Sequence, residues 1–175
     1  VNPGNTELTS ILQALAKPQL LEQATAQNIS NAVYAVGVLS QQGSLHAISD
    51  HVWQQLLGEQ QLQKIRPPQN VANTLLGMAR MTTCDPPIMS KEFAQYVAGE
   101  LLSHSAAGLS SWNAQHIADS MWACGMLSVA IPSFSEAVVA TAPSWLGGSI
   151  ALNIIQLAWA CGRLRIVSKP LMQQL

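Results

Sequence analysis

The sequence contains little charge and few aromatic residues. Charged residues occupy 10% of the 175 positions and aromatic residues 5%, whereas apolar residues reach 49%. Disordered chains are polar and rich in charge, so this composition excludes disorder as the general state. The formal net charge is −1, so no global positive field draws the chain onto nucleic acid.

Cysteines and long apolar runs are also scarce. The three cysteines, Cys84, Cys124 and Cys161, are too few for a disulfide framework and indicate a reduced compartment. No stretch of about 18 residues is free of polar groups, and the mean hydropathy is only +0.20. We therefore expect a soluble protein with no membrane insertion. Because the first residue is Val1, we also expect the sequence to be part of a longer protein.

Motifs for catalysis, cofactors and metals are missing. The chain has no Gly-x-Ser-x-Gly motif, phosphate-binding loop or dinucleotide fingerprint, so we expect no enzyme and no cofactor. The four histidines and three cysteines do not show the spacing of a zinc site, which needs four converging ligands. Ser44, His46 and Asp50 lie close together in the sequence, but a catalytic triad is defined by geometry and not by such proximity.

What the sequence does contain is an internal repeat. Segments 28–39, 70–81, 116–127 and 153–164 align without gaps, and their starts at 28, 70, 116 and 153 are 42, 46 and 37 residues apart. Periods of this size are typical of two-helix solenoid repeats. Apolar residues recur in steps of four and three, which predicts a helix in each segment. They form three columns: Ile29/Val71/Ile117/Ile154, Val33/Leu75/Met121/Ala158 and Val36/Met78/Cys124/Cys161.

Two further columns suggest how the helices pack. A bulky residue in each segment is predicted to fill the core of its unit. These residues are Tyr34/Leu76/Trp122/Trp159. Three residues later comes a small residue, which should let a neighbouring helix approach closely. These residues are Gly37/Ala79/Gly125/Gly162.

A second helix is expected between successive segments, over residues 44–57, 87–102 and 132–145. Pro87, Pro132 and Pro170 each fit the first turn of such a helix, whereas Pro143 predicts a kink or an early end. Residues 1–27 are expected to form N-terminal capping helices or a partial repeat. We predict an all-α fold, an α-solenoid of helix-turn-helix repeats of the right-handed type, with about four repeats over residues 28–175 and the last one incomplete.

Segment 69–81, Gln-Asn-Val-Ala-Asn-Thr-Leu-Leu-Gly-Met-Ala-Arg-Met, resembles the signature helix of octotricopeptide repeats. Segments 116–127 and 153–164 match it more loosely but keep the tryptophan, and the resemblance covers about residues 30–175. It implies a non-enzymatic RNA-binding α-solenoid in a mitochondrion or chloroplast. Members of the family act on messenger and intron RNA, or are structural parts of organellar ribosomes. The implied partners are single-stranded or ribosomal RNA and other proteins of a ribonucleoprotein assembly.

Side chains outside the apolar columns form a candidate RNA-binding surface. Each segment has two hydrogen-bonding residues three positions apart, and we call these eight residues the polar stripe. They are Asn28/Asn31, Asn70/Asn73, His116/Asp119 and Asn153/Gln156. Small residues come next on this side of each helix and predict a shallow gap that could seat a base. They are Ala35, Gly77, Ala123 and Ala160. Arg80 and Arg163 end the stripe and could reach phosphate.

The polar stripe has two interpretations. Repeat proteins that recognise one base per unit use two or three side chains in this way. Alternatively, these side chains cap their helices or bond to the neighbouring repeat. The pairs Lys64–Arg66 and Arg163–Arg165 are likewise either phosphate contacts or solvated loop charges. The pI of about 6.4 and the scarcity of Lys and Arg favour another function, an armadillo- or HEAT-like scaffold for protein–protein interaction within a larger complex.

Overall fold

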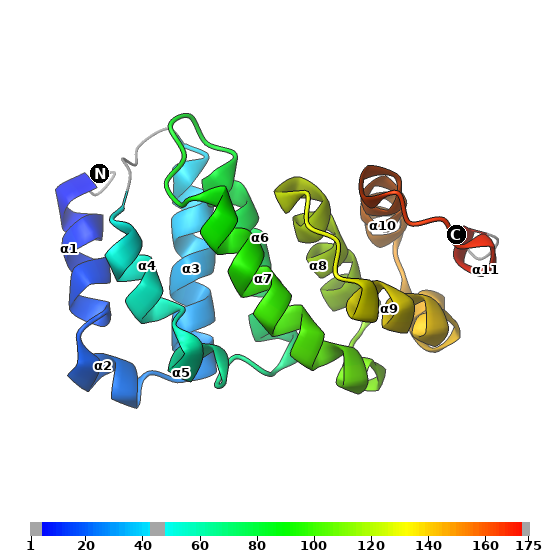
Figure 1. The fold of residues 1–175 in the computed structure, drawn as a ribbon, viewed down its shortest axis with the longest axis horizontal. Coiled ribbons are helices and arrows are strands. Elements are labelled where there is room, and N and C mark those ends of the chain that lie inside the picture. Colours follow the sequence, from blue (N-terminus) through cyan, green and yellow to red (C-terminus); the bar gives the residue numbers. More distant parts are fainter. Residues whose placement is uncertain (1–4, 43–47, 173–175) are drawn as a thin grey trace.

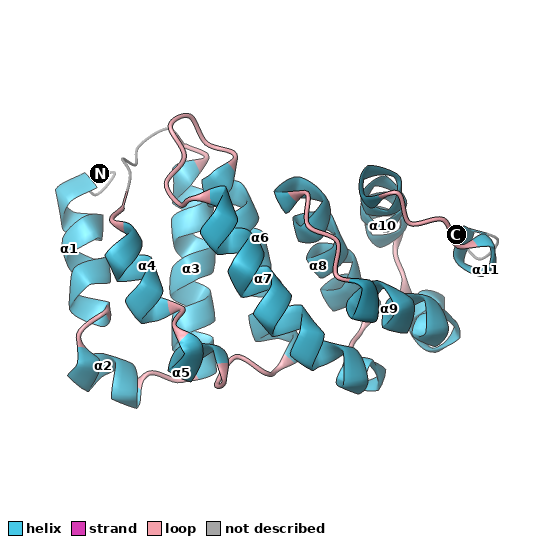
Figure 2. Ribbon diagram, viewed as in Figure 1, coloured by secondary structure: helices cyan, strands magenta, loops and turns pink. Residues whose placement is uncertain are grey.

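The computed structural model describes residues 5–42 and 48–172, and this part of the chain contains helices and loops but no strand (Figure 2). The predicted all-helical class is therefore confirmed. None of the helices described combines the length and the apolar character needed to cross a bilayer.

The described residues form α-helices and two short 3-10 helices. In chain order they are α1 (Asn5–Leu15), α2 (Pro18–Gln23), α3 (Ala26–Ser40), α4 (Asp50–Leu56), α5 (Glu59–Leu62), α6 (Pro68–Thr82), α7 (Lys91–Ser105), the 3-10 helix η1 (Ala106–Ser111), α8 (Ala114–Leu127), α9 (Pro132–Trp145), the 3-10 helix η2 (Leu146–Gly148), α10 (Ala151–Leu164) and α11 (Lys169–Met172).

The longer helices form two layers. Helices α3, α6, α8 and α10 lie side by side in one layer, and each packs extensively on the next (Figure 1). Helices α1, α4, α7 and α9 lie in front of them. The back layer contains the four aligned segments, so the helix predicted for each of them is confirmed. We call α3, α6, α8 and α10 the stacked helices.

The three apolar columns form the core of the first three units. All nine residues of these columns in α3, α6 and α8 are buried. In α10, Cys161 is buried, but Ile154 is half-buried and Ala158 is exposed. The front layer adds large core side chains, including Phe134 and Trp53, whose indole N–H donates to the Ile88 carbonyl at 3.3 Å.

The predicted core role of the bulky column is wrong for its last member. Leu76 is buried, Tyr34 and Trp122 are half-buried, and Trp159 is 42% exposed. This position lies where one stacked helix meets the next. The Trp159 ring packs on Gly125 and Trp122 of the preceding helix α8, and the described residues contain no stacked helix after α10 that covers the rest of it.

The second helix of each unit follows the predictions in part. Helix α9 spans 132–145 as expected, but it continues through Pro143 to Trp145, so the early end is wrong. Helix α7 begins at Lys91 and not at Pro87, because the Ser90 hydroxyl caps it by accepting from the Phe93 N–H. Of the helix predicted over 44–57, α4 covers only Asp50–Leu56, and residues 44–47, including His46, lie outside the described residues.

Candidate functional site

The polar stripe begins at the same place in each stacked helix. Asn28, Asn70, His116 and Asn153 are each the third residue of their helix. At this position a side chain can bond to the residue before the helix, and the backbone N–H still lacks a partner within the helix. The repeat in the sequence thus carries a signal for helix initiation as well as any signal for binding.

Two of the four residues at this third position act as caps. Asn28 Oδ1 accepts from the Thr25 N–H at 3.0 Å, and Thr25 Oγ1 accepts from the Asn28 N–H at 3.2 Å. Asn153 Oδ1 accepts from the Ile150 N–H at 3.2 Å, without the reciprocal bond because isoleucine has no polar side chain. The capping interpretation therefore holds for Asn28 and Asn153, whose amide oxygens are occupied within the protein.

The second residue of each pair behaves differently along the stack. Gln156 Nε2 donates to Asp119 Oδ1 at 3.0 Å and so joins α10 to α8, as the ladder interpretation predicts. Asn31 is exposed and Asn73 half-buried, and neither has a side-chain hydrogen bond within residues 5–42 and 48–172. Asn70 is also half-buried and has no side-chain hydrogen bond among these residues, so Asn31, Asn70 and Asn73 are the members of the stripe with the most capacity for an external ligand.

The shallow gap expected beside the polar pairs is absent over most of the stack. A Cβ at Gly77 would lie 2.5 Å from the Val33 carbonyl oxygen, because α6 presses directly on the backbone of α3. Ala123 and Ala160 are fully buried, and only Ala35 is exposed. Close helix packing fills the space that the sequence had suggested for a base.

Buried polar atoms without partners gather along the stacked helices. Four of them lie on α6, α8 and α10. They are Arg80 Nη1, His116 Nδ1, Ser120 Oγ and Gln156 Oε1. Three of the four belong to the polar stripe or to the arginine that follows it. Buried polar groups usually have partners, but these four atoms are out of contact with solvent, so an external ligand cannot reach them.

Burial also changes the titration of His116. Its ring contacts the edge of Trp112, with centroids 6.4 Å apart. Desolvation lowers the pKa of His116 from its ordinary value, and the nearby negative charge of Asp119 offsets part of that effect. At neutral pH the imidazole is therefore neutral, and it offers hydrogen bonds and no charge.

The two arginines of the site lie in different surroundings. The guanidinium of Arg80 lies over the Tyr34 ring, 4.9 Å from its centroid, so it is held in the contact between α6 and α3. Arg163 is exposed, and its Nη2 donates to Ser128 Oγ at 3.4 Å. Lys91 Nζ donates to the same hydroxyl at 3.3 Å. Arg163 and Lys91 thus form a small basic cluster at the C-terminal end of α8.

Sequence reasoning missed Lys91. Its available signal was the dipeptide Ser90–Lys91, which recurs as Ser168–Lys169. In both copies the serine hydroxyl accepts from the N–H three residues later, at 3.4 Å. The prediction that Lys64 is a phosphate contact or a solvated loop charge is wrong. Its ammonium donates to the carbonyls of Leu21 and Ala24 at 2.8 and 3.2 Å, and it caps the end of α2.

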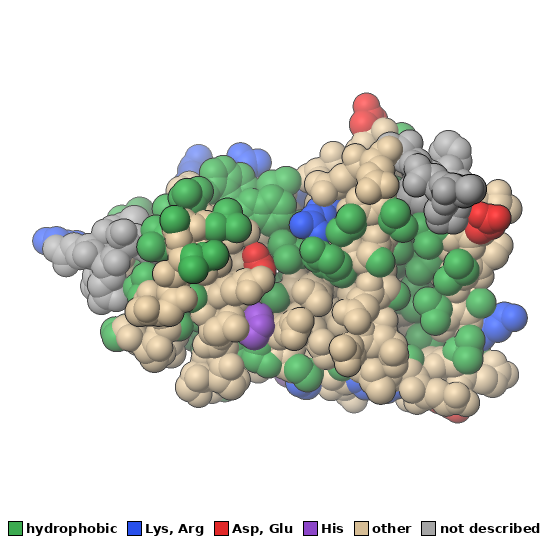
Figure 3. Space-filling view, turned by 180° about the vertical axis from the view of Figure 1, so that it is seen from behind, with side chains coloured by type: hydrophobic (Ala, Val, Ile, Leu, Met, Phe, Trp, Pro, Cys, Tyr) green, Lys and Arg blue, Asp and Glu red, His purple; other side chains and the backbone are tan. Residues whose placement is uncertain are grey.

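The layer of stacked helices presents a surface with few charges. Seen from behind, it consists mostly of hydrophobic and neutral polar atoms, with isolated charged side chains (Figure 3). Such a surface fits contacts through neutral hydrogen bonds and does not resemble a broad basic groove.

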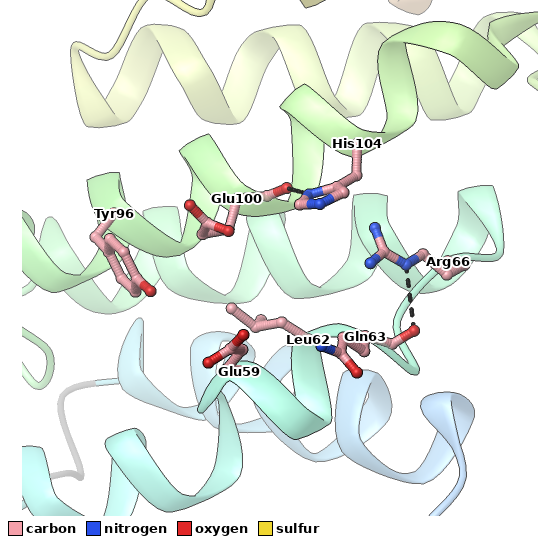
Figure 4. A pocket seen from close by; sticks show the side chains of 7 residues that line it. All are labelled: Glu59, Leu62, Gln63, Arg66, Tyr96, Glu100 and His104. Atoms are coloured by element: carbon pink, nitrogen blue, oxygen red, sulfur yellow. Dashed lines mark hydrogen bonds between the residues drawn. The ribbon is translucent and has the colours of Figure 1, made fainter.

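A cleft of about 400 Å³ opens on the other layer, between α5 and α7 (Figure 4). Its lining combines charges of both signs, including Glu59, Glu100 and Arg66. His104 Nδ1 lies 2.6 Å from the Glu100 carbonyl oxygen, one turn earlier in its own helix. The residues described contain no group of His, Cys, Asp or Glu side chains placed to hold a metal ion. The cleft therefore has no arrangement that identifies a ligand.

The thiols of the two buried cysteines are unreactive. Burial raises the pKa of the Cys124 thiol to about 12 and also raises the pKa of Cys161. Both remain protonated at neutral pH, and a thiol is a poor nucleophile in that form. They act as small packing residues, as their shared repeat position predicted.

A scan against protein-family models, a search of curated proteins and a search of solved structures each found no match to this chain.

Proposed function

We propose that the chain is a section of a right-handed α-solenoid that binds single-stranded or ribosomal RNA along its stacked helices. The observation that carries this proposal is the row of polar side chains with free hydrogen-bonding capacity on consecutive helices. Among the described residues, the side chains of Asn31, Asn70 and Asn73 have no hydrogen-bond partner, and all three are at least partly exposed. The edge of a base carries hydrogen-bond donors and acceptors that could pair with these side chains.

Lys91 and Arg163 are the proposed phosphate contacts. They are the two cations that meet at Ser128 without a carboxylate between them. With so few cations, counterion release gives a salt slope of only about −1 to −2, at about −0.7 per contact on single strands. Specificity would then come from the asparagine amides, because base contacts specify and phosphate contacts position.

The sequence resemblance adds the biological setting. It implies a non-enzymatic role on RNA in a mitochondrion or chloroplast, either as a reversible RNA-binding factor or as a fixed component of an organellar ribosome. Imaging of a tagged full-length protein tests the compartment. Sedimentation of that protein with or without ribosomal particles separates the two roles.

The binding experiment is a titration of the full-length protein against a randomised single-stranded RNA pool. The double variant Asn31→Ala/Asn73→Ala should change the preferred sequence more than the overall affinity. Lys91→Ala/Arg163→Ala should weaken all sequences and flatten the salt dependence. Matched controls are Gln13→Ala, on α1, and Lys17→Ala, in the turn before α2, two exposed residues that should leave binding unchanged. If both double variants bind as the wild type does, the stripe serves only as caps and ladder.

One observation favours the scaffold as a second candidate. The outward side of α10 exposes Leu152, Ile155 and Trp159, which are large apolar residues of a kind that protein interfaces cover. RNA-independent capture of a protein, lost in Ile155→Asp, would favour this alternative.

A further inference from the structure

The last stacked helix has an apolar side that the described residues leave largely uncovered, although the Trp159 ring at its edge packs on Gly125 of α8. Leu152, Ile155, Trp159 and Gly162 follow one another at helical spacing along α10, and all four are exposed. Ile155 is 65% exposed. We call these four residues the outer face of α10.

The positions of Ile155 and Gly162 are buried in the preceding stacked helices, whereas the position of Leu152 is exposed there, at Gln27, Gln69 and Gln115. Ile155 aligns with Ser30, Ala72 and Ala118, whose exposed fractions are 0%, 2% and 1%. Trp159 aligns with Leu76, which is 7% exposed, and with Tyr34 and Trp122, which are half-buried. In each earlier unit the next stacked helix covers this side, so the outer face of α10 continues an interface that the protein already uses three times.

The aligned glycines show the same difference at atomic scale. A Cβ at Gly37 would lie 2.6 Å from Cα of Gly77 on the next helix, and one at Gly125 would lie 2.6 Å from Cζ3 of Trp159. At Gly162 a Cβ would meet nothing within 4 Å. In α3 and α8 this glycine contacts the following stacked helix, whereas the space beside the equivalent glycine of α10 is open among the described residues.

The front layer gives a separate indication. Lys91 follows the capping Ser90 and reaches Ser128, at the end of the next stacked helix. Lys169 follows the capping Ser168 in the same way, but it has no side-chain partner among the described residues. An additional stacked helix that ended beside α11 would place its last turn within reach of Lys169.

We propose that the outer face of α10 is a docking surface for one more amphipathic helix of the stacked type. That helix carries a bulky apolar residue followed directly by Gly or Ala. The stacked helices share this pattern, in Tyr34–Ala35, Leu76–Gly77, Trp122–Ala123 and Trp159–Ala160. The small residue lets the two backbones approach, as Gly77 does against α3. The proposal does not depend on RNA binding.

A second copy of this chain is a poorer occupant. The open side of its α3 presents the same pattern, with Ala35 exposed. However, α1 precedes α4 at one end of the front layer and α11 follows α9 at the other end (Figure 1). Docking α3 of one copy on α10 of another would bring α1 and α11 into the same space.

The test supplies a further stacked helix from the chain's own sequence. Residues 128–164 are duplicated by inserting a second copy between Leu164 and Arg165, which keeps the register because Ser128 and Arg165 both end their helices in the left-handed conformation. The reporter is Ile155→Cys in the first copy, with Cys84→Ser to remove the half-exposed thiol. We expect its alkylation to slow by about tenfold or more relative to the chain without the insertion, since reactivity follows exposure.

Tyr96→Cys is the matched control, because Tyr96 is exposed on α7 away from the insertion, and its alkylation should be equal in both chains. Equal rates at position 155 in a folded extended chain would overturn the proposal. The proposal would also be overturned if the 175-residue chain were labelled slowly at position 155 and labelling became faster on dilution. That result would mean that a second copy of the chain covers the outer face of α10. If circular dichroism shows that the extended chain does not fold, a synthetic peptide of residues 128–165 is titrated instead. Saturable protection then supports the proposal, and no protection overturns it.

Discussion

Equivalent repeat positions are covered in one part of the molecule and uncovered in another. They are covered where α3 contacts α6, and they are uncovered on the outer face of α10. Gly37 and Gly77 bring two helix backbones into direct contact. Gly162 is in register with Gly37 and faces open space. The comparison shows that a repeated sequence position fixes which side of a helix is adapted for packing. It does not decide whether a partner is there.

The contact between α8 and α10 is intermediate between these two. Here the Trp159 ring fills the place above Gly125, and it lies 6.2 Å from the Trp122 ring, centroid to centroid. A side chain that is partly free can move, whereas a backbone cannot. The stack should therefore become more tolerant of substitution from α3 towards α10.

The largest expected difference is between two tryptophans. Trp53 is fully buried and its indole N–H is bonded, so Trp53→Ala should cost about 3–5 kcal/mol of unfolding free energy. Trp159 is far more exposed, so Trp159→Ala should cost about 1–2 kcal/mol. Urea unfolding followed by circular dichroism measures both. Equal losses would mean that the outer face of α10 is covered in solution.

The next effect concerns the backbone contact of α3 and α6. Alanine is intrinsically favoured over glycine in a helix by about 1 kcal/mol. At Gly77, however, the added Cβ would collide with the Val33 carbonyl, so Gly77→Ala should have a net cost of about 1–3 kcal/mol. Gly125→Ala is the matched variant, because there the Trp159 side chain can turn aside, and its effect should be close to neutral. A stabilising Gly77→Ala would show that the two helices are farther apart than described.

In α10 the effect of a glycine-to-alanine substitution on stability should change from a loss to a gain. Gly162→Ala meets no atom within 4 Å, so it should stabilise the protein by up to about 1 kcal/mol through helix propensity alone. Gly99→Ala, in α7, is the control, since its Cβ would also be free. The melting temperatures of the two variants should rise together. A loss at Gly162 beside a gain at Gly99 would reveal a helix docked on α10.

The smallest effect is a pH dependence inside the stack. The pKa of His116 in the folded protein lies below its ordinary value of 6.5 because of burial. Below that value the unfolded chain binds a proton that the folded protein resists, so stability falls as the pH decreases through 6.5 towards the folded pKa. In urea titrations from about pH 7.5 to about pH 5, His116→Gln should lose less stability than the wild type. A parallel decline in both proteins would place the ring in solvent.

Local patterns were sufficient for much of the fold. The helical period placed all four stacked helices, and Pro132 marked the start of α9. Capping by Asn28 was also within reach, because Thr25 stands three residues before it and completes a reciprocal pair. The start of α7 was missed because a proline in a loop resembles a proline in a first turn until the Ser90 cap is seen.

The candidate site depended more heavily on contacts between units. The bond from Gln156 to Asp119 joins residues on different helices, and the sequence pattern allowed it without distinguishing it from a binding pair. The shared hydroxyl of Ser128 brought Lys91 to Arg163 from another layer. Lys64 donates a hydrogen bond to the carbonyl of Leu21 in α2, which is far from Lys64 in the sequence. Side-chain reach across helices has no local signature.

The sequence by itself determined the helices, their repeat register and the side of each helix that is adapted to a neighbour, because these follow from backbone periodicity and capping within a few residues. Only the tertiary structure decided which of those sides is covered. Trp122 and Trp159 occupy the same repeat position, yet the first is half-buried and the second exposed. The reason is that burial is a property of the contact between two helices, and α10 is the last stacked helix of the described chain.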